Sequence, residues 1–588
     1  MKDFLKYTFA TVVGLVLTGI IFAAIGIVAL AGLIASASST APVTVKDNSV
    51  AVIRLNGTLT EQSQEDPLSL FMQEEFPNLS LQQVLDGIAY AKTSPKIKGI
   101  HLDAGTLAAP PAALQEIRDA LADFKTSGKF VTAYADGYTL GTYYVCSLAD
   151  RVMLNPQGSM TWDGLSAETM YYKELLEKLG VEMQIFKVGT YKSAVEPFTS
   201  TRMSDADREQ NLAYLQSVWN NMVQAVSASR SLPADTLQAY ADRRLSFRSA
   251  EELVARKMID TLIYRNDVKE YMDKTYGGAP KLELEEASVG ELARLRADEL
   301  ASRPHPTIAV YYAEGGIDDA SSNLEEGIHA PLMCDDLRSL ADDPDVKAVV
   351  LRVNSPGGSA FGSEQIWHEV ERLKAKKPVI VSMGGYAASG GYYISCAADS
   401  IVAEPTTLTG SIGIFGMIPN LQGTADKLGL RFDHVSTNRH PAASLFRPRD
   451  PEAQTAIQAN IERGYALFVK RCADGRGLST DSIRSIAEGR VWTGEMAKAR
   501  GLVDELGGLD TALRIAAEKA GLTDYAVARH PEQEDWLAKV LGGSWTGMME
   551  AGCRNLLGSD YESLRFVKQL KDQTPVQARL PYVLRISL

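Results

Sequence analysis

The sequence predicts an α/β protein that consists of two tandem copies of one unit, preceded by an N-terminal transmembrane helix. Three observations lead to this prediction. An uncharged apolar run occupies residues 7–35. Short β-branched segments alternate with helical patterns, which is typical of βαβ units with parallel strands and right-handed crossovers. The same series of segments occurs twice, so that the duplication covers roughly residues 48–521.

The apolar run YTFATVVGLVLTGIIFAAIGIVALAGLIA is longer than the ~20 residues that a helix needs to cross a bilayer. Lys2 and Lys6 precede it and no basic cluster follows it, so the positive-inside bias places the N-terminus in the cytoplasm. The rest of the chain then lies across the membrane. The small residues of Ser36–Ser38 keep open the alternative that the run is a cleaved secretory signal.

The composition is that of a large ordered protein, because 45% of its 588 residues are hydrophobic and 23% are charged. A net charge of -13 offers no basic surface for a phosphate backbone, so nucleic acid is not an expected partner. Five cysteines are too few and too scattered for a disulfide framework, and they lack the spacing of a zinc site. We interpret them as buried small hydrophobic residues, although an exported chain could pair two of them.

The duplication shows in matching strands. SVAVIRLNGTL matches TIAVYYAEGGI, PKIKGIHL matches PDVKAVVL, and GKFVTAYADGY matches KKPVIVSMGGY. Each segment is a β-branched run bounded by turn residues, which predicts a buried strand. Helical patterns lie between these strands, at residues 80–94, 110–128 and 363–377.

Later segments match as well. ARKMID of the first copy recurs as ARGLVD in the second, and a helix with capping-box residues Ser204 and Asp207 has a counterpart near Asp450. The sequence therefore divides into five parts. These are an N-terminus with its anchor at 1–47, a first repeat at 48–283, a charged helical linker at 284–304, a second repeat at 305–523, and a C-terminal arm at 524–588 that ends in the apolar strand LPYVLRISL.

The two copies differ where a nucleophile would lie. In the second copy the strand PVIVSM leads into GGYAASGGYYIS, which places Ser389 among glycines at the start of a helix. Glycine permits close backbone approach, and a helix N-terminus directs free N–H groups toward developing negative charge. A tight turn with a capping serine would have the same sequence. The first copy has Leu140 nearest to this position, and leucine cannot attack a carbonyl.

A second glycine pair follows the strand VVLRVN of the second copy, where Pro356, Gly357 and Gly358 turn the chain into a helix. Backbone N–H groups at such a turn can face a reacting carbonyl, and the loss of one such donor typically costs ~2.7 to 4 kcal/mol of transition-state stabilisation. The corresponding segment of the first copy, HLDAGTLAAPP, lacks the Pro-Gly-Gly. Taken alone, the motif would equally suit a structural turn.

A serine nucleophile needs an adjacent base, and none of the seven histidines lies in a convincing triad, although His434 and His440 are the best placed. Lys192 of the first copy, in VGTYKSAVEPF, aligns with Arg439 of the second. Arginine stays protonated, whereas a desolvated lysine can lose its proton near neutral pH. The first copy therefore keeps the base and the second keeps the nucleophile. Without this context, Lys192 would be interpreted as a surface lysine.

The segments GYAASGGYYIS, NSPGG, LTGSIGIFG and VGTYKSAVEPF closely resemble the motifs of the signal peptide peptidase A (protease IV) family in its long, duplicated, bacterial form. The resemblance covers nearly the whole chain. It implies a Clp-protease/crotonase-like fold of stacked ββα units and a membrane-bound serine endopeptidase that degrades remnant signal peptides. It also implies a bowl-like homotetramer in the bacterial inner (cytoplasmic) membrane, single-pass, with the catalytic body on the periplasmic side.

The resemblance assigns roles residue by residue. The nucleophile maps to Ser389, the general base to Lys192, and the serine that orients the lysine to Ser411. The oxyanion donors map to the backbone N–H groups of Gly358 and Gly390, with Gly357 next in line. No metal or organic cofactor is implied, and the implied partners are hydrophobic peptides, the lipid bilayer and further copies of the chain.

Two alternative functions stay open at this point. A crotonase-like enzyme acting on acyl-CoA thioesters would use backbone oxyanion donors with carboxylates as acid and base, because fold alone does not fix function. A membrane-tethered scaffold would use the duplicated halves only to assemble a ring. Neither alternative requires Ser389 or Lys192.

Overall fold

The computed structural model describes residues 45–62, 78–277, 285–301, 306–319, 327–440, 443–531 and 576–579, with short helical stretches between residues 6 and 22. The chain divides into two compact units, Met1–Asp47 and Asn48–Leu588. The predicted transmembrane segment at 7–35 lies mostly outside the described residues. Within the described part, none of the helices combines the length and the apolar character required to cross a bilayer.

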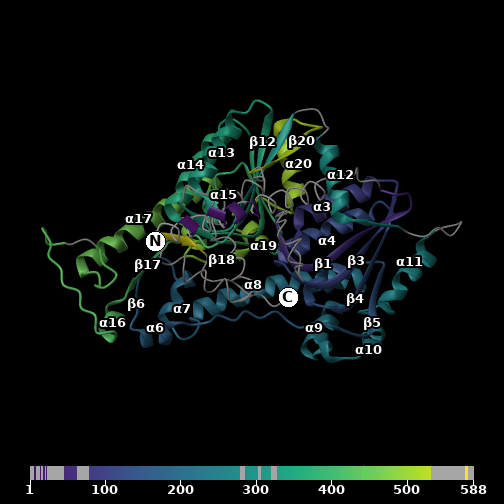
Figure 1. The fold of residues 1–588 in the computed structure, drawn as a ribbon, viewed down its shortest axis with the longest axis horizontal. Helices are drawn as coiled ribbons and strands as arrows, with labels where there is room; N and C mark the ends of the chain where they lie inside the picture. The colour runs from purple at the N-terminus through teal and green to yellow at the C-terminus, as the bar shows by residue number, and fades with distance from the viewer. Residues whose placement is uncertain are drawn as a thin grey trace. The chain divides into compact units, whose positions relative to one another are not determined.

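The first repeat forms a sheet with the strand order β2-β1-β3-β4-β5-β7, and β8 (Glu285–Ser288) pairs with β1. Its central strands pair in parallel, as the sequence predicts. Figure 1 shows these strands together with the helices that connect them. The elements are β1 (Ser49–Thr60), β2 (Asn78–Ser80), α3 (Leu81–Thr93), β3 (Ile97–Ala108), α4 (Pro111–Lys125), β4 (Phe130–Tyr138), α5 (Leu140–Cys146), β5 (Arg151–Met160) and β7 (Thr261–Leu262).

The second repeat forms the corresponding sheet, with the order β18-β16-β14-β12-β9-β20 and with β15 between β14 and β19. Strands β9, β12 and β14 are parallel and almost entirely buried, because helices cover the sheet. The elements are β9 (Thr307–Glu314), α13 (Ala330–Asp342), β12 (Val346–Ser355), α14 (Ala360–Lys374), β14 (Val379–Ala388), α15 (Gly390–Ser395), β15 (Ser400–Ala403), β16 (Leu408–Gly410), β18 (Val491–Thr493), β19 (Glu505–Leu506), α20 (Leu509–Ala520) and β20 (Ala526–His530).

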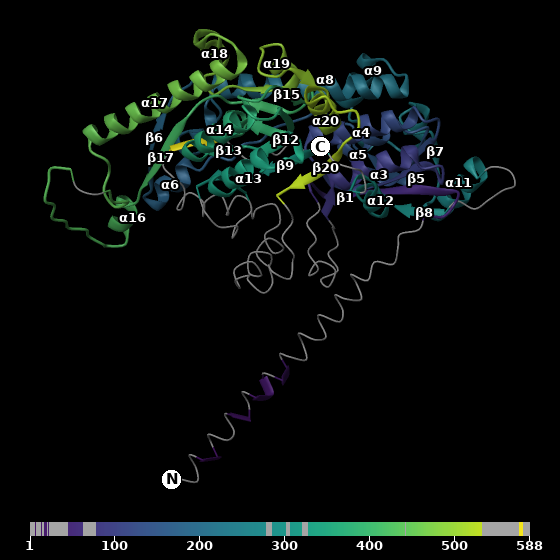
Figure 2. The same ribbon diagram turned by 90° about the horizontal axis from the view of Figure 1, so that it is seen from above.

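A third sheet combines both repeats and the C-terminal arm, in the order β11-β10-β13-β21-β17-β6. Strand β6 (Glu182–Lys187) of the first repeat pairs antiparallel with β17 (Phe415–Asn420) of the second, and the two lie side by side in Figures 1 and 2. Its other strands are β10 (Ile317–Asp318), β11 (Ile328–His329), β13 (Gly357–Ser359) and β21 (Val576–Arg579).

Two long helices occupy matching places in the repeats, α8 (Asp205–Arg230) and α17 (Pro451–Arg476). The Ser204 hydroxyl accepts a hydrogen bond from the Asp207 amide, and Asp450 caps α17 in the same way, which confirms both predicted helix starts. The remaining helices are α6 (Lys173–Leu179), α7 (Glu196–Thr199), α9 (Ala234–Asp242), α10 (Ala250–Ala255), α11 (Val268–Tyr276), α12 (Val289–Ala301), α16 (Gln422–Lys427), α18 (Thr480–Ile486) and α19 (Gly494–Lys498).

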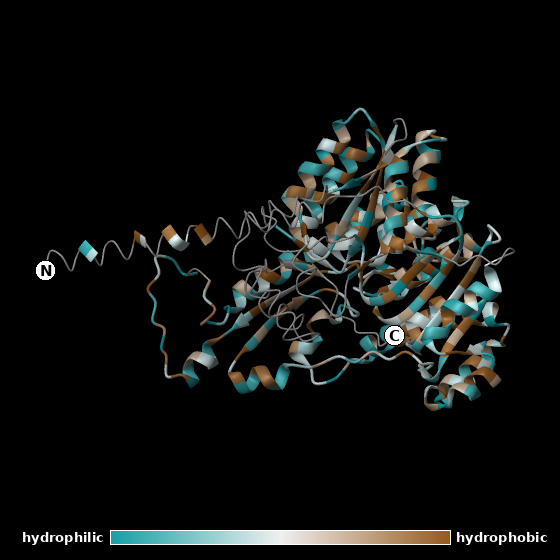
Figure 3. Ribbon diagram, turned by 45° about the vertical axis from the view of Figure 1, so that its right-hand side comes forward, coloured by the Kyte–Doolittle hydropathy of each residue, from teal (hydrophilic) through white to brown (hydrophobic). Residues whose placement is uncertain are grey.

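Hydropathy follows burial in these elements. In Figure 3 the strands are mostly hydrophobic, whereas the helices alternate between hydrophobic and hydrophilic residues. Cys146, Cys334, Cys396 and Cys472 are buried and free, as the sequence indicates, and Cys553 lies outside the described residues.

A buried ion-pair network joins the two repeats. Arg352 on β12, 1% exposed, donates to Glu61 and Glu116 of the first repeat and to Ser382 of its own sheet. Nitrogen–oxygen distances to the two carboxylates are 2.9 and 2.7 Å. The Glu116 carboxylate also accepts from the Leu509 amide at the start of α20. The repeats therefore share an interior polar contact as well as the third sheet.

The linker is not helical throughout, in contrast to the prediction, and the C-terminal arm contributes strands to two sheets. The linker begins as strand β8 before it becomes helix α12, because residues 285–288 add to the sheet of the first repeat. The arm begins with β20, which pairs with β9 in the second sheet, and it returns as β21 in the third. The predicted strand LPYVLRISL lies outside the described residues.

Candidate active site

Ser389 lies at the junction between β14 and α15, where it is the N-cap residue of the helix and is 0% exposed. Its backbone has φ 56° and ψ -112°, a conformation that non-glycine residues rarely adopt and that costs of order 1–3 kcal/mol. Its amide donates to the Gly410 carbonyl at 2.8 Å, and its carbonyl accepts from the Tyr393 amide. The sharp strand-to-helix turn presents the hydroxyl as nucleophile elbows do.

Lys192 comes from the first repeat, in the segment that follows β6 and precedes a short 3-10 turn at Ser193–Val195. Its Nζ lies 2.8 Å from Ser389 Oγ, although 197 residues separate the two in sequence. It also lies 3.0 Å from Ser411 Oγ and 3.1 Å from the Ser411 carbonyl oxygen. The structure thus brings the three predicted side chains together within one chain.

Burial dominates the electrostatics of Lys192. The side chain is completely buried, and this desolvation lowers its pKa well below the usual ~10.4. The oxygens that its Nζ meets among the described residues belong to hydroxyl and carbonyl groups. Because no described carboxylate is among these contacts to favour the ammonium form, the amine is set up to be neutral and able to accept a proton.

Ser411 is held in place by its backbone conformation and by hydrogen bonds to Gly489 and Arg490. It follows Gly410 in a left-handed turn, with φ 81° at the glycine and 50° at the serine. Its hydroxyl donates to the Gly489 carbonyl at 3.2 Å, and its amide donates to the Arg490 carbonyl at 2.7 Å. The hydroxyl oxygen is therefore directed to accept a hydrogen bond from Lys192.

The turn at Glu488 and Gly489 was not identified in the sequence, yet it holds the lysine segment. Thr190 donates through its hydroxyl to the Glu488 carboxylate at 2.6 Å, and the Tyr191 amide donates to the Glu488 carbonyl at 2.9 Å. Gly489 packs directly against Lys192. These contacts connect the Lys192 segment of the first repeat to the second repeat.

A signal for this turn exists in the sequence. The match between ARKMID and ARGLVD has an offset of 499 − 255 = 244 residues, which places Leu245 opposite Gly489 and Arg244 opposite Glu488. Arg244 and Glu488 share the left-handed conformation, with φ 53° and 55°. The second repeat thus has glycine where the first has a leucine, and the same comparison of the copies that found Ser389 would have found Gly489.

The three predicted oxyanion glycines lie beside Ser389, but they are not equivalent. The amide of Gly390 is the first of helix α15 and has no intrahelical acceptor. The amide nitrogen of Gly358 lies 3.0 Å from the position that a Cβ on Gly390 would take. The Gly357 amide donates to Ser355 Oγ at 3.1 Å, so it is already engaged. Gly358 and Gly390 are the better pair of donors.

Other sequence candidates lie away from this cluster. In the first copy, Leu140 is buried at the start of α5, and the preceding Thr139 hydroxyl is bound to Thr142 in a capping box. Arg439 and His440 lie on an exposed loop, where both pair with Glu452. His434 is exposed on the same loop. The described part of the chain contains no group of three or more His, Cys, Asp or Glu side chains able to hold a metal ion.

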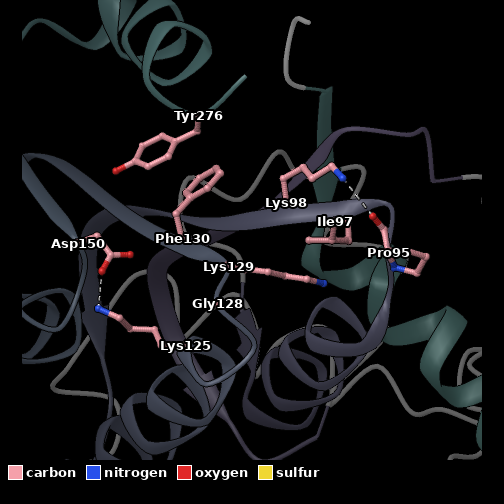
Figure 4. A pocket seen from close by; sticks show the side chains of 9 residues that line it. All are labelled: Pro95, Ile97, Lys98, Lys125, Gly128, Lys129, Phe130, Asp150 and Tyr276. Atoms are coloured by element: carbon pink, nitrogen blue, oxygen red, sulfur yellow. Dashed lines mark hydrogen bonds and ion pairs between the residues drawn. The ribbon is translucent and has the colours of Figure 1, made fainter. Parts of the chain in front are cut away.

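A surface pocket lies at the edge of the first repeat's sheet (Figure 4). Its ammonium groups already have partners, because Lys125 pairs with Asp150 at 2.7 Å and Lys129 donates to two backbone carbonyls. It contains no nucleophile paired with a base. The lining residues are Pro95, Ile97, Lys98, Lys125, Gly128, Lys129, Phe130, Asp150 and Tyr276.

Comparison with known proteins identifies the class of protein that this fold and site define. Peptidase family S49 matches residues 123–277 and 371–523, one match in each repeat. The chain therefore belongs to peptidase family S49 and is a serine peptidase, which confirms the predicted family and favours the peptidase over the acyl-CoA and scaffold alternatives.

Individual relatives carry matching names. The chain is 38% identical over 482 residues to Protease 4 of Haemophilus influenzae, covering 79% of this chain and 78% of the relative. It is 29% identical over 487 residues to the chloroplastic serine protease SPPA of Arabidopsis thaliana, covering 81% and 70%. A mutant ClpP1 of Listeria monocytogenes is similar with a TM-score of 0.24 and 18% identity, covering 37% of this chain and 98% of that one.

Proposed function

We propose that this serine peptidase uses a Ser/Lys dyad, with Ser389 as the nucleophile and Lys192 as the general base. The observation that carries the proposal is the 2.8 Å distance between Lys192 Nζ and Ser389 Oγ, in a place where both side chains are fully buried. A base must lie within hydrogen-bond reach of the proton that it removes, and its pKa must approach the working pH. Lys192 meets the first requirement, and burial lowers its pKa from the usual value in the direction that the second requires.

The reaction follows from this arrangement. The neutral amine of Lys192 takes the Ser389 proton, and the serine oxygen attacks a peptide carbonyl. The amide groups of Gly358 and Gly390 stabilise the resulting oxyanion. The lysine ammonium then protonates the leaving amine, which leaves an acyl-enzyme that water hydrolyses with Lys192 again as the base. The hydroxyl and carbonyl oxygens of Ser411 accept hydrogen bonds from Lys192 Nζ and so keep it oriented toward Ser389.

The proposed substrates are remnant signal peptides and other hydrophobic peptides, cleaved within the chain. The names of the relatives support this class, since one similar protein is called a putative signal peptide peptidase SppA. We propose that residues 7–35 anchor the enzyme as a single-pass protein in the bacterial inner membrane, with its catalytic body on the periplasmic side. Retention of the protein in carbonate-washed membranes, and protease access from the periplasm only, would test this.

We further propose that the chain assembles as a homo-oligomer, with a tetramer as the expected form. A group of exposed apolar side chains supports the presence of an interface between subunits. They lie on and beside α6 and α16, which contact each other through the bond from Thr424 Oγ1 to the Leu179 carbonyl, and Val435 among them is 100% exposed. Light scattering of the detergent-solubilised protein would measure the mass of the assembly. The exposed apolar residues of this group are Leu175, Leu179, Leu428, Leu430, Phe432 and Val435.

The dyad is tested by covalent labelling together with matched substitutions. A fluorophosphonate probe should label Ser389, and both labelling and peptide hydrolysis should be lost in Ser389→Ala. Ser395→Ala is the control, because Ser395 is equally buried on the same helix but binds the Gly391 carbonyl. Loss of hydrolysis in both serine variants, or retention in Ser389→Ala, would contradict the assignment.

The base is tested with two lysines. Lys192→Met should abolish acylation, whereas Lys129→Met should preserve it. Lys129 is a suitable control because desolvation lowers its pKa too, but it lies in the pocket of Figure 4 and not beside Ser389. If the Lys192 variant kept the parent rate and pH profile of acylation, the serine would have another base.

A further inference from the structure

Arg490 of the second repeat contacts the lysine segment, which is residues 190–193 of the first repeat. Its guanidinium lies over the ring of Tyr191, the residue before Lys192, at 4.5 Å from the ring centroid. It also lies over the ring of Trp492, at 4.6 Å from that centroid. Both distances are within the range of a cation–π interaction. Arg490 thus connects an aromatic ring of each repeat.

A shared carboxylate completes the contact between Arg490 and Tyr191. Arg490 Nη1 lies 2.8 Å from Glu209 Oε1, and the Tyr191 hydroxyl donates to the other oxygen of Glu209 at 3.1 Å. The Glu209 side chain is 55% exposed, so solvent screens this ion pair and it contributes little alone. Arg490 Nε, by contrast, is buried and has no hydrogen-bond partner among the described residues. The stacked guanidinium is therefore the main constraint on the Tyr191 ring.

The backbone of Arg490 holds the serine that Lys192 contacts. The Ser411 amide donates to the Arg490 carbonyl at 2.7 Å, and Ser411 Oγ lies 3.0 Å from Lys192 Nζ. One residue thus fixes the position of Ser411 through its main chain and the position of Tyr191 through its side chain. A substitution at Arg490 removes only the side-chain contact, because the carbonyl stays in place.

Gln210 on α8 connects the lysine segment to the residue after Arg490. Its side chain is buried, and its Nε2 donates to the Tyr191 carbonyl at 3.1 Å and to Ser193 Oγ at 3.2 Å. Its Oε1 accepts from the Val491 amide at 3.3 Å. The residues on both sides of the lysine are therefore tied to the strand that begins beside Arg490. A shift of Arg490 relative to the first repeat would strain both connections.

We propose that Arg490 is a positioning residue for peptide hydrolysis, which acts through Tyr191 to hold Lys192 Nζ within hydrogen-bond distance of Ser389 Oγ. The proposal rests on the Ser389/Lys192 assignment. Proton transfer requires close alignment of the two groups, and a misplacement of about 1 Å can cost roughly 100-fold in rate. Loss of the Arg490 side chain should therefore lower kcat. The KM should change little, because the interaction lost is one that serves the reaction and not the binding of the peptide.

Arg490→Met and Arg500→Met form a matched pair of variants. Arg500 also lies over the Trp492 ring, at 3.7 Å from its centroid, but its Nη1 donates to the Met496 carbonyl of the second repeat. With a fluorogenic apolar peptide, Arg490→Met should lower kcat about tenfold or more and change KM less than about twofold. Arg500→Met should keep both values within about twofold of the parent. Equal losses of kcat in the two variants, or a loss through KM alone, would overturn the proposal.

Arg490→Lys provides a conservative substitution at the same position. Lysine keeps the positive charge beside Glu209, but it lacks the planar group that stacks on the Tyr191 ring. The lysine variant should therefore recover part of the kcat that Arg490→Met loses. If the lysine variant is as slow as the methionine variant in the absence of a KM change, stacking alone positions the base. A lysine variant slower than the methionine variant would contradict the proposal.

Tyr191 tests whether the effect passes through the lysine segment. Tyr191→Phe keeps the ring that Arg490 contacts, whereas Tyr191→Leu removes it, so kcat should fall about tenfold in the leucine variant and less than about threefold in the phenylalanine variant. The double variant Arg490→Met with Tyr191→Leu should be about as slow as the slower single variant, because both changes break one contact. Equal kcat values in the two Tyr191 variants, or losses that multiply in the double variant, would reject the route through Tyr191. The Tyr191 comparison stays decisive even if Arg490→Met does not fold.

Labelling by the fluorophosphonate probe separates this proposal from the dyad itself. Ser389 should be labelled more slowly in Arg490→Met than in the parent, by a factor similar to the loss of kcat. If the parent is labelled at Ser389 and Arg490→Met is labelled at the same rate, the positioning role is wrong and the dyad stands. Absence of labelling at Ser389 in the parent would reject the dyad and the positioning role together.

Discussion

Gly489 lies in direct contact with Lys192, so that a Cβ added to the glycine would come within 2.6 Å of Lys192 Cβ and 2.8 Å of its Cα. The glycine also has φ 77°, which a residue with a side chain adopts at a cost of about 1–2 kcal/mol. Gly489→Ala should therefore displace the lysine and lower kcat/KM by about tenfold or more, equivalent to about 1.4 kcal/mol of transition-state stabilisation.

Gly477→Ala separates this effect from backbone strain. Gly477 ends α17 with φ 62°, and a Cβ there would meet no atom within 4 Å. Both variants carry the backbone strain, but Gly489→Ala adds the clash with Lys192, so it should lose more stability in thermal unfolding and it alone should lose activity. An equal loss of kcat/KM in the two variants would mean that the contact with Lys192 has no catalytic importance.

The buried amine of Lys192 should make the protein less stable than a variant without it. Its pKa is lowered in the folded state, so the unfolded chain binds a proton that the folded chain does not, from that depressed pKa up to ~10.4. Stability should consequently rise with pH across this window. Lys192→Met should raise the free energy of unfolding near pH 7, by about 1.4 kcal/mol for each pKa unit of depression above that pH, and should raise the Tm with it. The gain should shrink toward pH 10.

The lowered pKa of Lys192 should also determine how the rate of peptide hydrolysis depends on pH. Since only the neutral amine accepts the serine proton, kcat/KM should rise with pH through the depressed pKa of Lys192 and level off above it. Stopped-flow acylation from about pH 5 to pH 10 would measure this profile. A rate that levels off only above the usual lysine pKa would show that burial does not tune the base.

Arg352→Met should destabilise the fold strongly, because it leaves Glu61 and Glu116 buried without their cation. Removal of one partner from a buried ion pair typically costs about 3–5 kcal/mol. Burial already raises the pKa of Glu61 even with Arg352 opposing the shift. In the variant, the carboxylates should protonate on folding, so the loss of stability should grow as pH rises. Chemical denaturation at two pH values would measure the effect.

An exposed arginine provides the comparison for Arg352. Arg514 pairs with Glu505 and Glu518 at 2.7 and 2.8 Å, but it lies on the surface. Arg514→Met should cost little stability, because solvent screens such pairs. Similar losses in both variants would argue against a special role for the buried network between the repeats.

Glu404 should be uncharged in the folded protein at neutral pH. Burial, assisted by the nearby Glu116 and Asp119, raises its pKa to about 9, and its Oε2 has no hydrogen-bond partner among the described residues. Its contribution to stability is complete below the unfolded pKa of ~4.3 and is lost as pH rises through about 9. Glu404→Gln, which stays neutral, should match the parent near pH 4 and exceed its Tm near pH 9. Equal Tm values across this range would contradict the shift.

The sequence predicts the central strands and the site because the two copies can be compared. Ser389 faces a leucine in the alignment and Lys192 faces an arginine, and such exchanges are visible without coordinates. The structure places Ser389 and Lys192 within hydrogen-bond distance. The role of Ser411 depended on the resemblance alone, whereas the glycine turns at Gly358 and Gly390 also indicated oxyanion donors from the sequence, and the roles of all the site residues stay predictions until they are tested by mutation.

Features that depend on distant partners were not predictable. Arg352 lies within an apolar strand pattern, and the carboxylates that neutralise it belong to the other repeat, so no local signal indicates the pair. Strand β21 has the sequence VQAR, which shows no strand periodicity, and its partners lie more than 150 residues away. Its position depends on the edges of β13 and β17, with which it pairs.

The pairing of β6 with β17 has a consequence for how the duplicated halves can change. A shift in either strand would move the lysine segment that follows β6 relative to Ser389 in the second repeat, so each half limits the substitutions that the other tolerates. In the proposed dyad, the first repeat supplies the amine of Lys192 and the second supplies the hydroxyl of Ser389. The two copies therefore have to be retained together, since their backbones are still alike but the side chains at the site differ between them.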